Sequence, residues 1–288
     1  KDPSVIILEH APAKINPGLG ITGKRPDGYH VIISLFQTVT LFDDLELDNS
    51  GEPGIFCPVG GVPENADNLV LKAERVFRDA TGLNRSVRFT LTKRIPVGAG
   101  LGGGSSDAAA ALRGLARLHG IDTQDNQLLR NCAEKIGSDV PFLLDGGTAI
   151  VEGRGERLTP VAWPFGWTYV IVFPGFGVST AWAYGRVRRY SPVDAGYGAM
   201  LRRLQSGNAS AGDVLGSIGN DFEDAVFPEY PVLEKISDDL VKSGAEAAFL
   251  TGSGSSMVGV FATNDAADKS AETFRNRGLD AWAVIPER

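Results

Sequence analysis

A glycine-rich segment contains the residues that most directly indicate chemistry. Five glycines lie within residues 98–104, and Ser105 and Ser106 follow them. Apolar residues recur at helical spacing over residues 108–118, and the alternating segment Val87–Thr92 before the glycines is typical of a strand. Glycines let backbone N–H groups approach an anion, and a helix N-terminus adds partial positive charge. The unit therefore predicts a phosphate-binding loop, with Ser105 or Ser106 as N-cap of the helix.

Three alternative interpretations of the glycines are weaker. A flexible linker would not lie between a strand and a capped helix. The pattern Gly98-x-Gly100-x-x-Gly103 satisfies the dinucleotide fingerprint, and Asp122 lies near the place of its ribose-binding acid. That fingerprint follows a short buried strand, however, whereas apolar and polar residues alternate in the strand before these glycines. The pattern Gly18-x-x-x-x-Gly23-Lys24 resembles a P-loop, but Arg25 replaces the Ser or Thr that binds magnesium.

Other polar residues cluster where predicted strands and helices end. Lys14 and Asn16 follow the first predicted strand, and Asp139 lies between a helix and a Val-Pro pair that favours extended backbone. A Gly/Ser-rich turn, Thr251–Ser256, separates two apolar strands, and a Pro-Asp-Gly turn precedes Tyr29-His30. Taken singly, each segment could also be a surface charge, a cap or a hairpin turn. Together they are candidate site segments.

Composition limits the classes of function. The chain has 288 residues, 43% of them hydrophobic and 22% charged, and a net charge of −7. This acidic balance argues against a nucleic-acid surface, so an anionic ligand needs local cations and backbone dipoles. Cys57 and Cys132 lack metal-ligand spacing and are expected to be reduced core thiols. No apolar run spans a membrane and no signal peptide is evident, which predicts a cytoplasmic protein, or a plastid stromal one if a transit segment was removed before Lys1.

Strands and helices alternate along the chain at intervals of 30–40 residues, which predicts an α/β plait, a two-layer α+β arrangement. A new apolar strand begins after Trp163–Trp167, so we expect a domain boundary there. The predicted strands are 4–8, 31–39, 44–48, 87–92, 146–151, 169–173, 247–250, 258–261 and 281–285; the predicted helices are 68–81, 108–118, 126–136, 181–190, 232–243 and 266–276.

In order and spacing, Lys14 with its Pro-Ala-Lys-Ile-Asn context, the loop of residues 96–109 and Thr251–Ser256 resemble the three motifs of the GHMP small-molecule kinases. Pro17 and Gly20 depart from this family, which has larger apolar residues there, so the first strand is expected to bend early. Within the family, the chain is similar to the branch that phosphorylates 4-diphosphocytidyl-2-C-methyl-D-erythritol. That similarity rests on six further segments: 25–30, 34–37, 67–69, 139–142, 146–148 and 220–223.

The resemblance implies transfer of a phosphoryl group from ATP, with Mg²⁺, to the 2-hydroxyl of that acceptor, a step of non-mevalonate isoprenoid precursor biosynthesis. Asp139 would be the catalytic base and Lys14 the catalytic cation, which also keeps Asp139 ionised. Ser106 would bind Mg²⁺. The implied ATP-binding residues are Asn68, Lys93, Pro96, Val97, Gly98, Ala99, Gly100, Leu101, Gly102, Gly103, Gly104, Ser105 and Ser106; the implied acceptor-binding residues are Asn16, Tyr29, His30, Tyr184, Thr251 and Gly252.

The implied fold has an N-terminal, ribosomal-protein-like domain with a left-handed βαβ unit, residues 1–165, and a ferredoxin-like C-terminal domain, residues 166–288. The protein would bind small molecules, neither nucleic acid nor membrane, as a monomer or homodimer. Three rivals remain: another kinase of the family, of homoserine or mevalonate type; a non-catalytic nucleotide-binding regulator descended from such a kinase; and a dehydrogenase. Retention of both Lys14 and Asp139 argues against the regulator.

Overall fold

The structure is a computed structural model that describes residues 4–58, 62–83, 87–124, 126–192 and 197–287. The chain divides into two compact units. The first comprises Lys1–Ala13, Leu41–Val97 and Gly102–Gly146, and the second comprises Lys14–Thr40, Gly98–Leu101 and Gly147–Arg288. Spatial proximity defines these units, and they interleave along the chain, so the predicted domain boundary near residue 165 stays a prediction.

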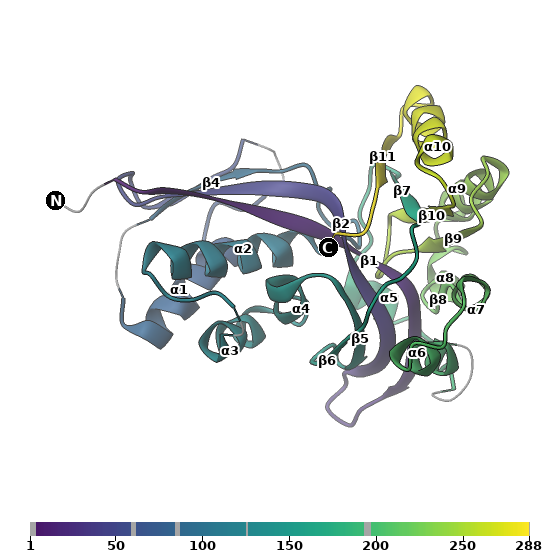
Figure 1. The fold of residues 1–288 in the computed structure, drawn as a ribbon, viewed down its shortest axis with the longest axis horizontal. Helices are drawn as coiled ribbons and strands as arrows, with labels where there is room; N and C mark the ends of the chain where they lie inside the picture. The colour runs from purple at the N-terminus through teal and green to yellow at the C-terminus, as the bar shows by residue number, and fades with distance from the viewer. Residues whose placement is uncertain (1–3, 59–61, 84–86, 125, 193–196, 288) are drawn as a thin grey trace. The chain divides into compact units, whose positions relative to one another are not determined.

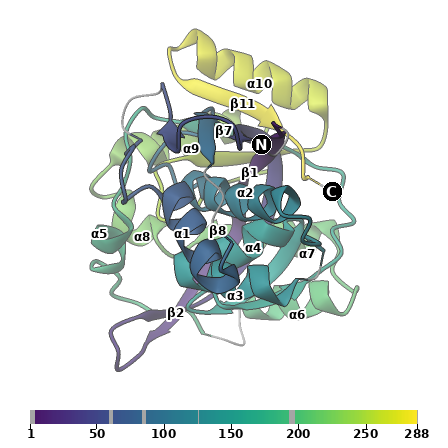
Figure 2. The same cartoon turned by 90° about the vertical axis from the view of Figure 1, so that its left-hand side faces the viewer.

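The first unit combines a sheet with four helices. Strand β4 (Arg88–Thr92) pairs antiparallel with β2 (His30–Asp48) and parallel with β3 (Gly54–Phe56), and β2 neighbours β1 (Ile6–Lys24). Both long strands, β1 and β2, contribute residues to both units. The helices pack on one another beside these strands (Figures 1 and 2); they are α1 (Leu69–Thr81), α2 (Gly103–Leu118), α3 (Gln127–Ile136) and α4 (Val140–Asp145).

Helix α2 contacts the helices α1, α3 and α4. Its residues 106–112 are all buried, which fits the alanine-rich sequence of a helix with neighbours on several sides. The helix begins at Gly103, with Gly102 as the N-cap residue at φ 70°. The prediction that Ser105 or Ser106 caps the helix was therefore wrong: the last glycines of the loop form its first turn.

The second unit contains a four-stranded antiparallel sheet in the order β11-β7-β10-β9. Helix α9 packs on β9 and β10, and α10 packs on β7 and β11. Along the chain, α9 precedes β9 and α10 precedes β11. This chain order, together with the order of the strands in the sheet, is that of the predicted ferredoxin-like plait. The bounds of these elements are β7 Thr168–Phe173, α9 Pro231–Lys242, β9 Ala247–Leu250, β10 Met257–Phe261, α10 Asn264–Asn276 and β11 Asp280–Val284.

The remaining elements of the second unit are short. Strand β5 (Thr148–Gly153) pairs antiparallel with β2 and with β6 (Arg157–Pro160), and β8 (Gly219–Asn220) pairs parallel with β1. The predicted helix over 181–190 is only α5 (Thr180–Tyr184), which Ser179 caps. Three of the short helices in the described residues were not predicted: α6 (Tyr197–Gln205), α7 (Ala211–Leu215) and α8 (Glu223–Val226). Helices α7 and α8 each bury only one residue, which is too few to show a periodic pattern.

Strand β1 is much longer than the sequence suggests. It runs without interruption to Lys24, so the prediction that Lys14 follows the first strand was wrong: Lys14 lies in the strand interior. Gly20 has a packing reason, because a Cβ there would lie 3.2 Å from the ring of Tyr197. Gly18 is similar, because a Cβ there would lie 2.9 Å from Tyr197 Cδ1, so the two glycines make room for this aromatic ring.

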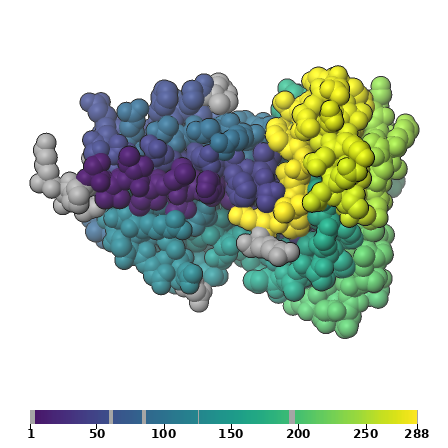
Figure 3. Space-filling model, turned by 45° about the horizontal axis from the view of Figure 1, so that its top comes forward, coloured from purple at the N-terminus to yellow at the C-terminus, as the bar shows by residue number. Residues whose placement is uncertain are grey.

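The surface and the cysteines match ordinary expectations. The beginning of β1 lies on the surface of the first unit (purple in Figure 3), where Ile6 and Leu8 are exposed. Cys57 and Cys132 are buried thiols, which confirms the prediction of core thiols, and burial raises the pKa of the Cys132 thiol. Within the ranges that the structure describes, no helix has both the length and the apolar composition needed to cross a membrane.

Candidate active site

Lys14 and Asn16 form a buried polar pair on β1 in the second unit. Lys14 Nζ donates to Asn16 Oδ1 at 2.7 Å and lies 5.1 Å from the ring centroid of Phe36. Asn16 Nδ2 donates to the hydroxyl of Ser34 at 3.3 Å. Both side chains point to the same side of the strand because their spacing is two residues. The strand thus holds an ammonium and an amide together in a site nearly closed to solvent.

The loop after β9 packs on the glycine loop and on these two residues. Asn16 N donates to Thr251 Oγ1 at 3.1 Å, and Lys14 N donates to Leu101 O at 2.9 Å. Gly100 has φ 79°, and a Cβ there would lie 2.1 Å from Thr251 O. A Cβ on Gly252 would lie 2.9 Å from Gly100 O and 3.2 Å from Lys14 Nζ. All three predicted motifs therefore meet within the second unit, and glycine is required where the two loops touch.

The first turn of α2 completes the glycine segment in the first unit. Its first N–H groups, from Gly103 to Ser105, have no carbonyl partner inside the helix and are oriented with the positive end of the helix dipole. No acidic residue lies in this turn. Ser106 Oγ is buried and has no hydrogen-bond partner within the described part of the chain. This turn has the chemistry to bind a phosphate, and the Ser106 hydroxyl is an oxygen ligand of the kind that Mg²⁺ accepts.

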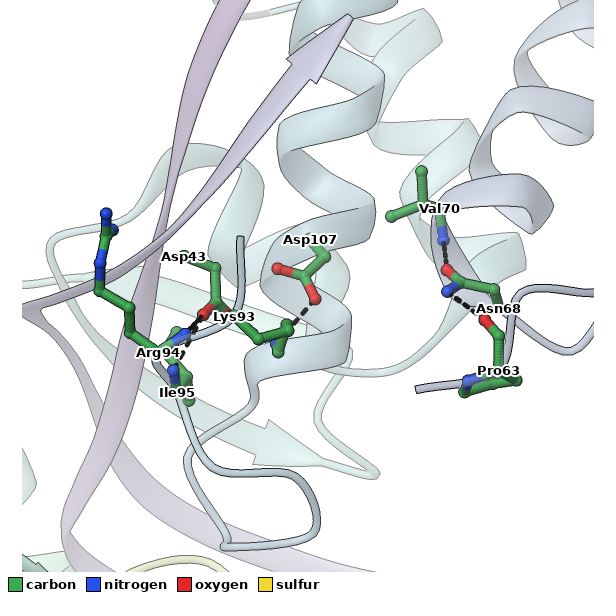
Figure 4. A network of polar contacts seen from close by, with 8 residues as sticks. All are labelled: Asp43, Pro63, Asn68, Val70, Lys93, Arg94, Ile95 and Asp107. Atoms are coloured by element: carbon green, nitrogen blue, oxygen red, sulfur yellow. Dashed lines mark hydrogen bonds and ion pairs between the residues drawn. The ribbon is translucent and has the colours of Figure 1, made fainter. Parts of the chain in front are cut away.

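A buried ion cluster lies beneath this turn (Figure 4). Lys93 Nζ contacts a carboxylate oxygen of Asp43 and lies 2.8 Å from Asp107 Oδ2, and the Lys93 side chain is only 4% exposed. Asp43 Oδ1 also accepts from the backbone N–H of Arg94 at 2.5 Å and of Ile95 at 2.9 Å. Burial raises the pKa of Asp107 to about 7, against the opposing effect of Lys93. The cluster thus connects Lys93, which precedes the glycine loop, to Asp107 in α2, which follows it.

The two residues predicted to line the adenine pocket already have partners in the first unit. Lys93 is held by two carboxylates, so any contact with adenine would come from its aliphatic stem. Asn68 caps α1: its Oδ1 accepts from Val70 N at 2.8 Å, and its Nδ2 donates to Pro63 O at 2.7 Å (Figure 4). Their roles toward adenine stay predictions.

Asp139 lies in the first unit at the start of α4. It occupies the N-cap position, but its side chain makes no capping hydrogen bond, since φ −87° and ψ −15° are already helical values. Ser138 Oγ lies 3.4 Å from Asp139 Oδ1. The side chain is only partly buried. The role of Asp139 as base stays a prediction.

Two of the residues predicted to bind cytosine, His30 and Tyr184, lie in an aromatic cluster of the second unit. His30 stacks on Tyr184 with ring centroids 4.8 Å apart and an interplanar angle of 18°, and Tyr184 meets Phe222 edge-on at 4.8 Å. Burial and the nearby charge of Lys24 lower the pKa of His30. Tyr29 is 59% exposed, so its ring is available for stacking. A base between Tyr29 and Tyr184 would have to use the face of Tyr184 that His30 does not cover.

Sequence reasoning missed several residues of these clusters. Arg154 places its guanidinium 5.2 Å from the ring centroid of Tyr29, and no sequence pattern indicated it. Asp43 is separated from Lys93 by 50 residues and has no motif of its own. Asp107, by contrast, follows the two serines directly, and its place on a buried helix turn could have indicated a paired charge.

The chain matches two family descriptions, "GHMP kinases N terminal domain" over residues 68–147 and "GHMP kinases C terminal" over residues 201–279. It is 40% identical to the 4-diphosphocytidyl-2-C-methyl-D-erythritol kinase of Chlorobaculum parvum over 262 residues, which cover 90% of this chain and 91% of the relative. It is 37% identical to the kinase of the same name from Geobacter sulfurreducens over 281 residues, which cover 95% and 96%.

Solved structures agree with these relatives. A crystal structure of 4-(cytidine 5'-diphospho)-2C-methyl-D-erythritol kinase matches with a TM-score of 0.81 and 34% identity over 98% of this chain and 100% of the other. A homoserine kinase from Cytophaga hutchinsonii matches with a TM-score of 0.76 at 18% identity, over 98% and 94%. The second likeness concerns the fold alone.

Proposed function

Because the chain belongs to the GHMP kinases, and within them to the 4-diphosphocytidyl-2-C-methyl-D-erythritol kinases, we propose that it phosphorylates the 2-hydroxyl of 4-diphosphocytidyl-2-C-methyl-D-erythritol with ATP. As a GHMP kinase it is an ATP-dependent small-molecule kinase. The observation that carries the substrate assignment is the identity of 40% to a relative of that name over 90% of the chain.

The reaction forms a bond between the acceptor oxygen and the γ-phosphorus, breaks the bond from that phosphorus to the β–γ bridging oxygen, and releases ADP. Asp139 takes the proton of the 2-hydroxyl as the new bond forms. Lys14 neutralises charge on the phosphoryl oxygens, and Asn16 orients the acceptor hydroxyl. The Lys14–Asn16 hydrogen bond of 2.7 Å supports this division, because it fixes both groups before the substrates arrive.

The phosphates of ATP would be held by backbone N–H groups of the glycine loop and by the first turn of α2. The first turn of α2 supports this, because its N–H groups lie at the positive end of the helix dipole and the turn contains no acidic residue. Ser106 would bind Mg²⁺, which supplies charge neutralisation at the phosphates when present. Its buried and unpartnered hydroxyl supports that assignment within the described residues.

The cytidine end of the acceptor would lie at Tyr29 and at the stacked rings of His30 and Tyr184. Stacking on aromatic side chains contributes about 1–3 kcal/mol per base. Binding energy from this remote group would position the reacting hydroxyl. The Arg154 guanidinium beside Tyr29 supports an anionic, aromatic ligand at this place.

Phosphorus NMR tests the proposal directly. The protein is mixed with ATP, Mg²⁺ and 4-diphosphocytidyl-2-C-methyl-D-erythritol, and a new phosphomonoester signal is expected together with ADP. Homoserine, mevalonate and galactose are the matched alternative acceptors and should give no signal above background. Turnover of any of these three at the rate of the cytidine compound would assign the chain to another branch of the family, and no turnover of any acceptor would favour the non-catalytic regulator.

A further inference from the structure

The segment Asn220–Glu223 contains buried and half-buried polar side chains to which the reaction assigns no role. Asn220 lies on β8 and is only 5% exposed. Its Nδ2 donates to Leu250 O at 2.6 Å and to Gly252 O at 2.7 Å, and its Oδ1 accepts from Phe222 N at 2.9 Å. One amide therefore holds the carbonyl groups on both sides of Thr251.

Glu223 holds the same loop from the other direction. Its Oε1 accepts from Leu250 N at 2.9 Å, so both backbone groups of Leu250 are bound by side chains of this segment. Asp221 ties the segment to β1, because its Oδ2 accepts from Ile21 N at 2.6 Å and its N–H donates to Leu19 O at 3.0 Å. The segment is thus a fixed support between β1 and the end of β9.

The loop that this segment holds contacts the proposed catalytic groups. Thr251 Oγ1 contacts Asn16 through two hydrogen bonds, of 3.1 and 3.3 Å. Ser256 N donates to Ala99 O at 3.1 Å, and a Cβ on Gly252 would lie 3.2 Å from Lys14 Nζ. A shift of the loop by about 1 Å would therefore displace the partners of Lys14 and the surface that receives the glycine loop.

We infer that Asn220 and Glu223 are positioning residues for phosphoryl transfer, which act through the loop of residues 250–256 on Lys14 and on the glycine loop. This inference rests on the proposed function for its kinetic consequences. The residues touch no reacting atom; they fix the place of the groups that do. A misplacement of about 1 Å at a distance from the chemistry can cost about 10²-fold in rate.

Two variants of Glu223 form a matched pair. Glu223→Gln keeps an oxygen that accepts from Leu250 N, whereas Glu223→Met has nearly the same length and no acceptor. We expect Glu223→Gln to keep kcat within about 2-fold of wild type and Glu223→Met to lower kcat about 10-fold, with a higher KM for ATP. Asn220→Leu removes both donors to the loop and should lower kcat about 10²-fold.

A core variant separates positioning from general stability. Phe274→Leu in α10 removes buried volume where this helix packs on β7 and β11, and it destabilises the same unit. At a temperature well below every Tm, it should keep wild-type kcat. Hydrogen exchange gives a second readout: the amides of Thr251, Gly254 and Ser256 should exchange at least about 10-fold faster in Glu223→Met and not in Phe274→Leu.

The outcomes are distinct. Wild-type kcat in both Glu223→Met and Asn220→Leu, or an equal loss in Phe274→Leu at matched Tm, would overturn the inference. If Asn220→Leu does not fold, the pair at Glu223 decides alone. If the wild-type protein phosphorylates none of the acceptors, the proposed function fails. Amide hydrogen exchange in the loop and the Kd for ATP, both measured without turnover, then still decide whether these residues position the loop.

Discussion

Gly100 offers the sharpest test of the loop packing. Its φ of 79° is left-handed, and a Cβ there would lie 2.1 Å from Thr251 O and 3.0 Å from Gly254 O. Both neighbours are backbone atoms of the loop held by Asn220, so they cannot rotate away as a flexible side chain could. Gly100→Ala must therefore push the two loops apart by about 1 Å or more, judged from the shortest contacts that Cβ atoms make, near 3.0 Å.

This displacement sets the expected magnitude. An error of about 1 Å in a positioning element can cost about 10²-fold, so we expect Gly100→Ala to lower kcat/KM for ATP by about that factor. Alanine at a left-handed position alone costs about 1–2 kcal/mol of stability. Gly175→Ala is the matched control, because Gly175 has φ 88° and nothing within 4 Å of a Cβ. It should show the stability cost without the kinetic loss.

Coupled-enzyme detection of ADP, with ATP varied at saturating acceptor, measures the kinetic effect, and thermal unfolding measures the stability effect. Kinetics of Gly100→Ala that match those of Gly175→Ala would refute the reasoning, because the two loops would then not need their close contact. A loss that appears only in the KM for the acceptor would also contradict it, since the contact concerns the predicted phosphate loop.

Three further predictions concern the other parts of the site. Asp139→Asn should lower kcat about 10²–10⁴-fold, the usual contribution of a positioned base, with little change in the Kd of the acceptor by calorimetry; near-normal turnover would remove Asp139 from the mechanism. Tyr29→Ala should raise the KM for the cytidine substrate about 5–150-fold and leave that for ATP unchanged, and an equal rise for both would argue against a cytosine site. Burial raises the pKa of Glu223 from 4.5 to about 7, so the folded state binds this proton more tightly than the unfolded state does. The free energy of unfolding, measured by chemical denaturation, should therefore fall as pH rises from about 4.5 to about 7. The same dependence of the unfolding free energy on pH in Glu223→Gln would contradict this.

Local patterns in the sequence identified the elements that bury an apolar face. The helix over 126–136 and the strands 169–173 and 247–250 were predicted nearly to the residue, because alternation or helical spacing is clear there. The long β1 was missed, since its prolines and glycines resemble breaks. Proline is tolerated in a strand where its nitrogen needs no hydrogen-bond partner. Gly18 and Gly20 make room for the ring of Tyr197, and the sequence does not show that this ring packs there.

For the site, the residue types can be read from the sequence alone: a lysine and an asparagine, followed by one glycine-rich and one Gly/Ser-rich segment in a fixed order. Residue type is enough for this because each type limits the chemistry it can do. The partners of these residues become visible only in the folded chain. It placed Thr251 against Asn16, 235 residues away, and paired Lys93 with Asp43, 50 residues away. Such pairings arise from the packing of distant strands and helices, and spacing along the chain carries no record of them.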